Sequence, residues 1–184
     1  EEIKIDGKTI SELGGEIELN TEKTNNYFHL LKSYIDLPAN PSSIFLAHLT
    51  LGAYMKVDED ELCHWIEGQC KKLHQVVLNF NHLGLFALKV LFIAPQPSTE
   101  LVQMHQLIHE RYDNDYGEIG YNYTIQSNNW VPHVTLLMDD KEKILNALPI
   151  LNEKFTPFKG NIVSLALYEY HTLREIKNYD LRLI

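Results

Sequence analysis

The sequence has few cysteines, a shortage of positive charge and no long apolar run, and each shortage excludes a class of protein. It has two cysteines in 184 residues, far fewer than a small disulfide-stabilised scaffold uses. No apolar run approaches the ~20 residues of a membrane-spanning helix, so we expect no membrane partner. The length suffices for one domain, or two small lobes, around a sizeable core.

The charge balance argues against binding to long nucleic acid. The chain has 16 lysines and arginines against 25 aspartates and glutamates, a net charge of −9. Proteins that bind extended RNA or DNA through many phosphates need a basic face, because counterion release drives their affinity. A short or cyclic nucleotide held through one or two phosphates is compatible with this charge.

The two cysteines predict a reduced protein. Cys63 and Cys70 lie in "ELCHWIEGQC", where a helix would separate them by about 10 Å along its axis. That separation is too large for a disulfide. Free thiols, and the lack of a positive-then-apolar leader at the start of the chain, predict a cytoplasmic location.

Hydrophobic periodicity predicts alternating strands and helices. The expected helices are 27–35, 58–77, 98–113 and 139–155; the expected strands are 42–54, two within 76–95 broken near 81–84, 131–138, and two or three within 157–184. A long polar loop is expected at 113–130. Asp6-Gly7 predicts a hairpin, so we separate an N-terminal extension, 1–14, from a domain of 15–184.

The two halves of the chain repeat one order of elements. "AHLTLG", an acidic helix and "FNHLGLFALKVLF" correspond to "PHVTLL", an acidic helix and "FKGNIVSLALYEY". This order predicts an internal duplication and an α+β fold. We expect two pseudo-symmetric lobes of antiparallel sheet with outer helices, each lobe contributing one His-x-Thr strand to a central cleft.

The repeated His-x-Thr motif is the strongest candidate for chemistry. Strand side chains alternate between faces, so His48 and Thr50 share one face, and His133 and Thr135 share another. The apolar residues between them anchor each strand in the core. About 0.4 such matches are expected by chance, so one match is weak, but two at corresponding places in a duplicated unit favour a site over two buried polar pairs.

Two imidazoles and two hydroxyls facing one cleft would suit a phosphodiester. One neutral histidine takes a proton from the attacking oxygen, while the other, protonated, donates to the leaving oxygen. Threonine hydroxyls donate to the non-bridging oxygens as charge builds there. This chemistry requires no metal or other cofactor.

At these residues the sequence resembles the two-histidine (2H) phosphoesterase superfamily, which includes the 2′-5′ RNA ligase-like proteins. The resemblance covers 15–184. It implies a groove between two lobes and metal-independent action on 2′-5′ linkages, 2′,3′-cyclic phosphates or cyclic oligonucleotides. By this resemblance His48 and His133 are the acid/base pair, and Thr50 and Thr135 bind phosphate.

The sequence departs from some branches of that superfamily, in which a basic residue closely follows one motif. Here Gly52 and Leu137 occupy those positions, which argues against RNA ligation and against long RNA as a ligand. The implied partner is a small nucleotide, an RNA end or a short oligonucleotide.

Aromatic residues near the motifs are candidates for stacking on a nucleobase. Trp130 precedes the second motif, and Tyr54 follows the first. Tyr121 and Tyr123 lie in the polar loop, where lid residues are often found. The alternative for Trp130 is that it covers the start of its strand.

A second pair of histidines has the spacing of metal ligands but lacks the rest of a metal motif. His105 and His109 share a helix face at i, i+4. Gln106 stands where the zinc-protease motif requires glutamate, and no third ligand is apparent. A packed or solvated helix face is the favoured interpretation.

The sequence thus predicts a phosphoric diester hydrolase that acts on a 2′,3′-cyclic phosphate or a 2′-5′ phosphodiester. One alternative is a hydrolase of cyclic or 2′-5′ oligonucleotide messengers. Another is a nucleotide-binding module of the same fold without turnover; the integrity of both motifs argues against it.

Overall fold

The computed structural model describes residues 4–5, 8–9, 28–36, 47–55, 57–113, 120–170, 172 and 174–183 of the chain. The elements in chain order are β1 (Lys4–Ile5), β2 (Lys8–Thr9), β3 (Phe28–Ile35), β4 (His48–Met55), α2 (Glu59–Cys70), β5 (Val76–Phe86), β6 (Val90–Pro95), α3 (Thr99–Ile108), η1 (Tyr121–Tyr123), β7 (Val134–Met138), α5 (Lys141–Lys154), β8 (Phe158–Glu169) and β9 (Arg174–Asp180). The predicted α+β class with an antiparallel sheet is confirmed.

A seven-stranded sheet forms the body of the molecule. Its order is β4-β3-β8-β5-β6-β7, and β9 also pairs with β8. All of these strand pairs are antiparallel. The long strand β8 pairs with β5 through residues 158–162 and with β3 through residues 162–169. The sheet therefore has two halves, β4-β3-β8-β9 and β8-β5-β6-β7, joined along one strand.

The duplicated units span both halves. Each unit is a strand, a helix and a strand: β4-α2-β5 and β7-α5-β8. The last strand of the first unit, β5, lies in the half that contains β7, and β8 reaches the half that contains β4. The motif strands β4 and β7 consequently stand at the two ends of the strand order and are not neighbours.

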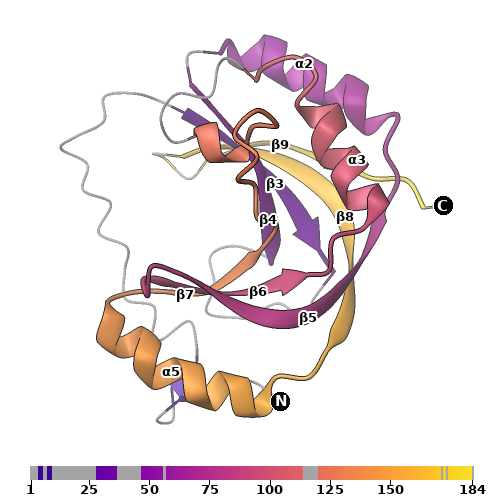
Figure 1. The fold of residues 1–184 in the computed structure, drawn as a ribbon. Helices are drawn as coiled ribbons and strands as arrows, with labels where there is room; N and C mark the ends of the chain where they lie inside the picture. The colour runs from indigo at the N-terminus through magenta and orange to yellow at the C-terminus, as the bar shows by residue number, and fades with distance from the viewer. Residues whose placement is uncertain are drawn as a thin grey trace.

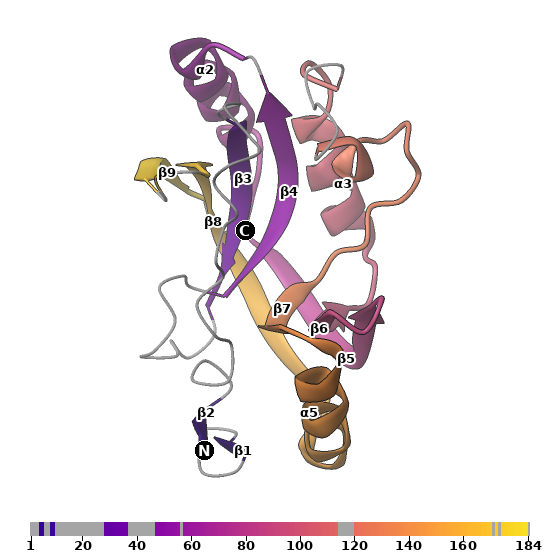
Figure 2. The same ribbon diagram turned by 90° about the vertical axis from the view of Figure 1, so that its left-hand side faces the viewer.

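The helices lie on the outer side of the curved sheet (Figures 1 and 2). One cluster of buried apolar side chains joins β3, β4, β5 and β8 to α2 and α3, and a smaller one joins β6 and β7 to α5. The N-terminal caps are Asp58, Ser98 and Asp140, whose side chains accept from backbone N–H groups of the first turn. The predicted helices at 58–77, 98–113 and 139–155 are confirmed, although the first two end earlier than expected, at Cys70 and Ile108.

The predicted helix at 27–35 is wrong, because this segment is β3. Residues 31–35 are all buried, since both faces of β3 are covered. Leu31 and Ile35 belong to the core cluster, while Lys32 and Tyr34 are buried on the other face. Burial on both faces removes the period-two pattern of a half-exposed strand, and the remaining apolar spacing imitated a helix.

The break between β5 and β6 comes later than the predicted 81–84. The strands turn at Ala87 and Leu88, whose φ angles are 49° and 54°. Positive φ at both central residues is typical of a type I′ hairpin, which usually uses Asn or Gly. The 81–84 region instead contains a β-bulge, between Phe80 and His82.

Three further observations concern the N-terminal hairpin, the cysteines and the length of the helices. β1 and β2 pair antiparallel on either side of Asp6-Gly7, whereas the expected boundary between residues 14 and 15 lies outside the described residues. Cys63 and Cys70 are free thiols. Among the described residues, no helix combines the length and apolar character needed to cross a bilayer.

Gly84→Ala should destabilise the fold, because a Cβ at this position would lie 2.3 Å from the Phe92 ring. We expect a loss of about 1–3 kcal/mol in the free energy of unfolding, as for overpacking in a core. Gly68→Ala is the matched control, since nothing lies within 4 Å of its Cβ position in α2. It should gain up to about 1 kcal/mol from helix propensity. Urea unfolding measures both, and equal effects would contradict the packing argument.

Candidate active site

The first motif lies at the start of β4 and alternates as expected. Leu49 and Leu51 are fully buried, while His48 and Thr50 are half-buried on the opposite face. In the ladder with β3, Thr50 pairs with Lys32, and Gly52 pairs with the adjacent Leu31. Leu51 is the extra residue between them. A β-bulge therefore directly follows the motif.

The second motif repeats this arrangement, with His133 directly before β7 and Thr135 within it. Val134 is buried, whereas His133 is half-buried and Thr135 is exposed. The ladder to β6 pairs Thr135 and then Leu137 with consecutive residues and skips Leu136. The expected anchor, Leu136, is only half-buried, and Leu137 is 2% exposed instead, because the bulge shifts the alternation by one residue.

Both motif strands therefore have the same local form. Each has a histidine, a buried apolar residue, a threonine and then the bulged leucine. β-Bulges bend a strand and redirect its side chains, and they are over-represented beside active sites. The internal duplication is thus preserved at the level of individual backbone pairings, which the sequence pattern alone did not predict.

His133 has a defined tautomer and an apolar environment. Its Nδ1–H donates to the carbonyl oxygen of Val131 at 2.7 Å, so Nε2 has the free lone pair when the ring is neutral. The ring centroid lies 4.9 Å from that of Phe86 and 5.0 Å from that of Phe92. Burial lowers the pKa of His133, and the hydrogen bond to Val131 opposes this only in part. A histidine with a lowered pKa is neutral near pH 7, and a general base must be neutral before it takes a proton.

His48 lies beside a row of tyrosines on the same face of the sheet. It pairs in register with Tyr34, and their rings meet edge to face at 6.3 Å. The Tyr34 hydroxyl donates to the Tyr168 hydroxyl at 2.5 Å, and Tyr168 donates to Glu175 at 2.5 Å. Lys32, the cross-strand partner of Thr50, is on this face too. The sequence analysis missed Lys32 and Tyr34, because the helix expected at 27–35 concealed which of its side chains share a face with the motif.

Two ring N–H groups cover the outer edge of β4. The indole Nε1 of Trp130 donates to the Thr50 carbonyl oxygen at 3.1 Å, and Nε2 of His109 bonds the Leu51 carbonyl oxygen at 2.8 Å. We call Trp130 and His109 the edge clamp. Because Trp130 precedes the second motif by three residues, the edge clamp fixes the approach to β7 against the first motif.

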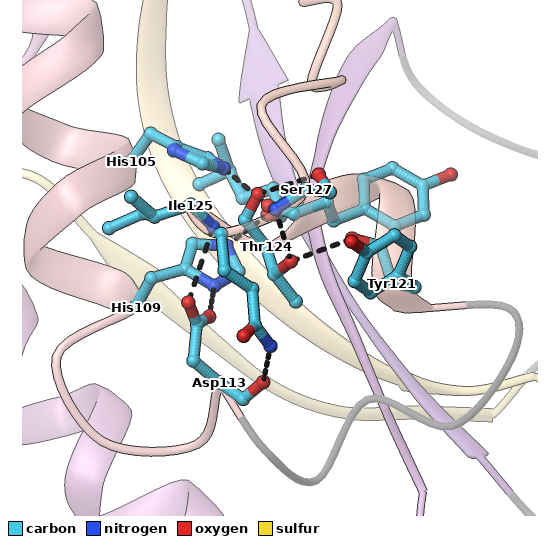
Figure 3. Close-up of polar contacts among 10 residues, drawn as sticks. His105, His109, Asp113, Tyr121, Thr124, Ile125 and Ser127 are labelled. Carbon is cyan, nitrogen blue, oxygen red and sulfur yellow. Dashed lines mark hydrogen bonds and ion pairs between the residues drawn. The ribbon is translucent and has the colours of Figure 1, made fainter.

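A hydrogen-bonded cluster supports the edge clamp (Figure 3). His109 pairs through Nδ1 with the Asp113 carboxylate, which also accepts from the backbone N–H of Ile125 at 3.2 Å. His105 bonds the Tyr123 carbonyl oxygen through Nε2 at 2.6 Å and stacks on Trp130 with the centroids 3.8 Å apart. The cluster thereby joins α3, the loop that contains η1 and the motif strand β4.

In this cluster the ring nitrogens of His105 and His109 are engaged in hydrogen bonds within the protein. Both side chains are buried, and the Nε2 atom of each faces a backbone carbonyl oxygen. Within the described part of the chain, no group of three histidine, cysteine, aspartate or glutamate residues could hold a metal. The favoured interpretation, a packed helix face, describes both histidines.

The aromatic candidates have different surroundings. Tyr54 is 2% exposed and packs edge-on against Tyr112, so the expectation that it contacts a ligand is wrong: core packing covers it. Trp130 stacks on His105, and Tyr121 is 39% exposed. Tyr123 is half-buried, and its hydroxyl bonds the side chain of Thr50, so the loop does reach the first motif.

The family comparison agrees with this architecture. A model described as the 2′-5′ RNA ligase superfamily matches residues 45–174, more than half of the chain. The chain belongs to the 2′-5′ RNA ligase superfamily. The resemblance to 2H phosphoesterases is confirmed at this level. No curated protein sequence matches the chain.

Several solved structures resemble this chain in fold but share little of its sequence. E. coli LigT complexed with 3′-AMP has a TM-score of 0.55 and 17% identity, covering 85% of this chain and 98% of that one. LigT complexed with ATP gives 0.52 and 16%, with 86% and 99% covered. A structure described only as a phosphoesterase gives 0.55 and 15%, with 85% and 99% covered. At such identities the likeness establishes the fold.

Trp130→Phe should distinguish the energy of the indole hydrogen bond from that of the stacking on His105. Phenylalanine keeps a ring against His105 but cannot donate to the Thr50 carbonyl oxygen, so we expect a loss of about 1 kcal/mol in the free energy of unfolding. Trp130→Ala removes both contacts and should cost about 3–5 kcal/mol. Urea unfolding distinguishes the two, and a neutral Trp130→Phe variant would refute the role of the donor.

His105 should make the fold sensitive to acid. Burial lowers its pKa to about 4 from an ordinary value of 6.5, so on acidification the unfolded chain takes up this proton first. The stability contributed by neutral His105 is present above pH 6.5 and is lost as the pH falls towards 4. His105→Phe should flatten the pH dependence of the free energy of unfolding across this window; an unchanged slope would exclude His105 as its source.

Proposed function

We propose that the protein is a metal-independent phosphodiesterase that hydrolyses a 2′,3′-cyclic phosphate or a 2′-5′ phosphodiester. His48 and His133 are its acid/base pair, and Thr50 and Thr135 bind the phosphate. The observation that supports this most is the shared form of the two motif strands, with a bulge after each threonine. Membership of the 2′-5′ RNA ligase superfamily supports the same class of reaction.

The surroundings of the histidines favour an assignment that the sequence left open, with His133 as the base. Its Nδ1–H is engaged with Val131, and its lowered pKa keeps the ring neutral near pH 7. His133 Nε2 takes a proton from water as the water oxygen bonds to phosphorus. The bond from phosphorus to the ribose oxygen breaks, and protonated His48 donates to that oxygen.

The threonines would stabilise the charge that builds on the phosphate. Each hydroxyl is on the same face of its strand as the histidine two residues earlier, and can donate to a non-bridging oxygen. Thr135 is exposed, and Thr50 also bonds Tyr123. Because Thr50 has a single hydroxyl proton, we propose that in the substrate complex this proton turns to the phosphate oxygen while the Tyr123 hydroxyl donates to Thr50 Oγ1, and we keep Tyr123 among the substrate-site residues.

We infer a small ligand: a nucleotide, an RNA end or a short oligonucleotide. The net charge of −9 disfavours long nucleic acid. The related structures of LigT are complexes with ATP, 3′-AMP and NADP+, and a nucleotide of this size is the ligand we propose here. Tyr121, whose side chain is exposed, is the best candidate for base stacking, since one face of Trp130 is covered. The free thiols of Cys63 and Cys70 suit the proposed cytoplasmic location.

Replacing either motif histidine should abolish most turnover. We expect His48→Ala and His133→Ala each to lower kcat by at least about a hundredfold, as for loss of a general acid or base. The assay uses 2′,3′-cyclic nucleotides, 2′-5′ oligoadenylate and cyclic dinucleotides with a chelator present. His74→Ala, at an exposed position, is the matched control and should retain full activity.

The same assay separates the competing functions. Hydrolysis of 2′-5′ oligoadenylate or cyclic dinucleotides in preference to cyclic nucleotides would assign the messenger hydrolase instead. Tight binding of these ligands without turnover would assign a binding module. Activity that the chelator abolishes would contradict the metal-independent mechanism.

A further inference from the structure

One buried cation lies next to the first motif. Lys32 is 5% exposed, and it is the only lysine or arginine that is buried among the described residues. Its neighbours across the ladders are Thr50 on β4 and Ala166 on β8. Because cross-strand partners share a face, the Lys32 side chain lies on the face of His48 and Thr50, opposite the core.

The amine of Lys32 lies over an aromatic ring on the same face of the sheet. Its Nζ is 4.8 Å from the centre of the Tyr168 ring, a cation–π distance. Desolvation lowers the pKa of Lys32 to about 8, which means that burial works against its charged form. The geometric observation is that this buried amine starts from the cross-strand partner of Thr50, on the face that also carries His48.

Two exposed cations of β9 are held in ion pairs with carboxylates. Arg174 pairs with Glu59 and Glu169, and Lys177 pairs with Glu67. Neither motif is closely followed by a basic residue in its own strand. Lys32 on β3 therefore supplies a positive charge beside Thr50 that the motif strand itself lacks.

We propose that Lys32 is a third anion-binding residue of the site, whose ammonium group contacts a non-bridging phosphate oxygen beside Thr50. The position of the phosphate rests on the proposed function. An ammonium group offers three donors, and a hydrogen bond from a charged donor to an oxyanion is stronger than one between neutral groups.

The test measures binding and stability of the same variants. Inorganic phosphate and 3′-AMP are titrated into the wild type, Lys32→Met, Lys32→Arg and Lys72→Met by calorimetry. Lys32→Met should weaken the binding of both probes by about 10–100-fold, the loss of one charge-assisted hydrogen bond. Its melting temperature should stay equal or rise, because a buried amine is removed. Lys32→Arg should recover part of the affinity.

Lys72→Met controls for net charge, because Lys72 is exposed after the end of α2; it should bind within about twofold of the wild type. Unchanged phosphate and 3′-AMP binding in Lys32→Met would overturn the proposal and leave Lys32 a packing residue. Should Lys32→Met fail to fold, Lys32→Gln replaces it in the same comparison.

The outcomes for Lys32 and for the proposed function are distinguishable. Binding that depends on Lys32, without hydrolysis of any diester, would support Lys32 and refute the hydrolase. Hydrolysis that depends on His48 and His133, with kcat/KM unchanged in Lys32→Met, would support the hydrolase and refute Lys32. A wild type that binds neither probe would refute the proposal for Lys32.

Discussion

The arrangement of the molecule depends on the double pairing of β8. Its first residues form a ladder with β5, and its later residues form ladders with β3 and β9. Among the described strands, it is the one that pairs with members of both halves. The two motif strands belong to one continuous sheet for this reason, although neither touches the other. Each is the terminal strand of its half, so the backbone groups along its outer edge have no neighbouring strand to pair with.

The free edge of β4 is covered by side chains. The edge clamp, Trp130 and His109, satisfies carbonyl oxygens along β4, and Asp113 and His105 hold the clamp in turn. Because Trp130 lies on the segment that leads into β7, the clamp orders the first motif and restrains the start of the second. Side chains that resembled a metal pair in the sequence are therefore structural supports of the site.

The elements that could be predicted from the sequence are those whose signals are local. Capped amphipathic helices such as α3, and strands with one polar face such as β4, are recognisable without tertiary information. β3 was missed because both of its faces are buried, which depends on what packs against it. The turn at Ala87 and Leu88 was missed because neither residue usually adopts positive φ. The bulges at Leu51 and Leu136 depend on the partner strand, so no pattern within the motif reveals them.

The strand order determines how the separation of the two motifs is set. Five ladders separate β4 from β7, and neighbouring strands in a sheet rotate by about 20–25° relative to each other. The spacing of the two imidazoles is therefore an accumulated property of the whole sheet. Small changes in twist at any intermediate ladder, such as the one in which Gly84 pairs with Phe92, would increase or decrease the separation of the two histidines. Residues far from both motifs can thus alter how the two imidazoles are spaced.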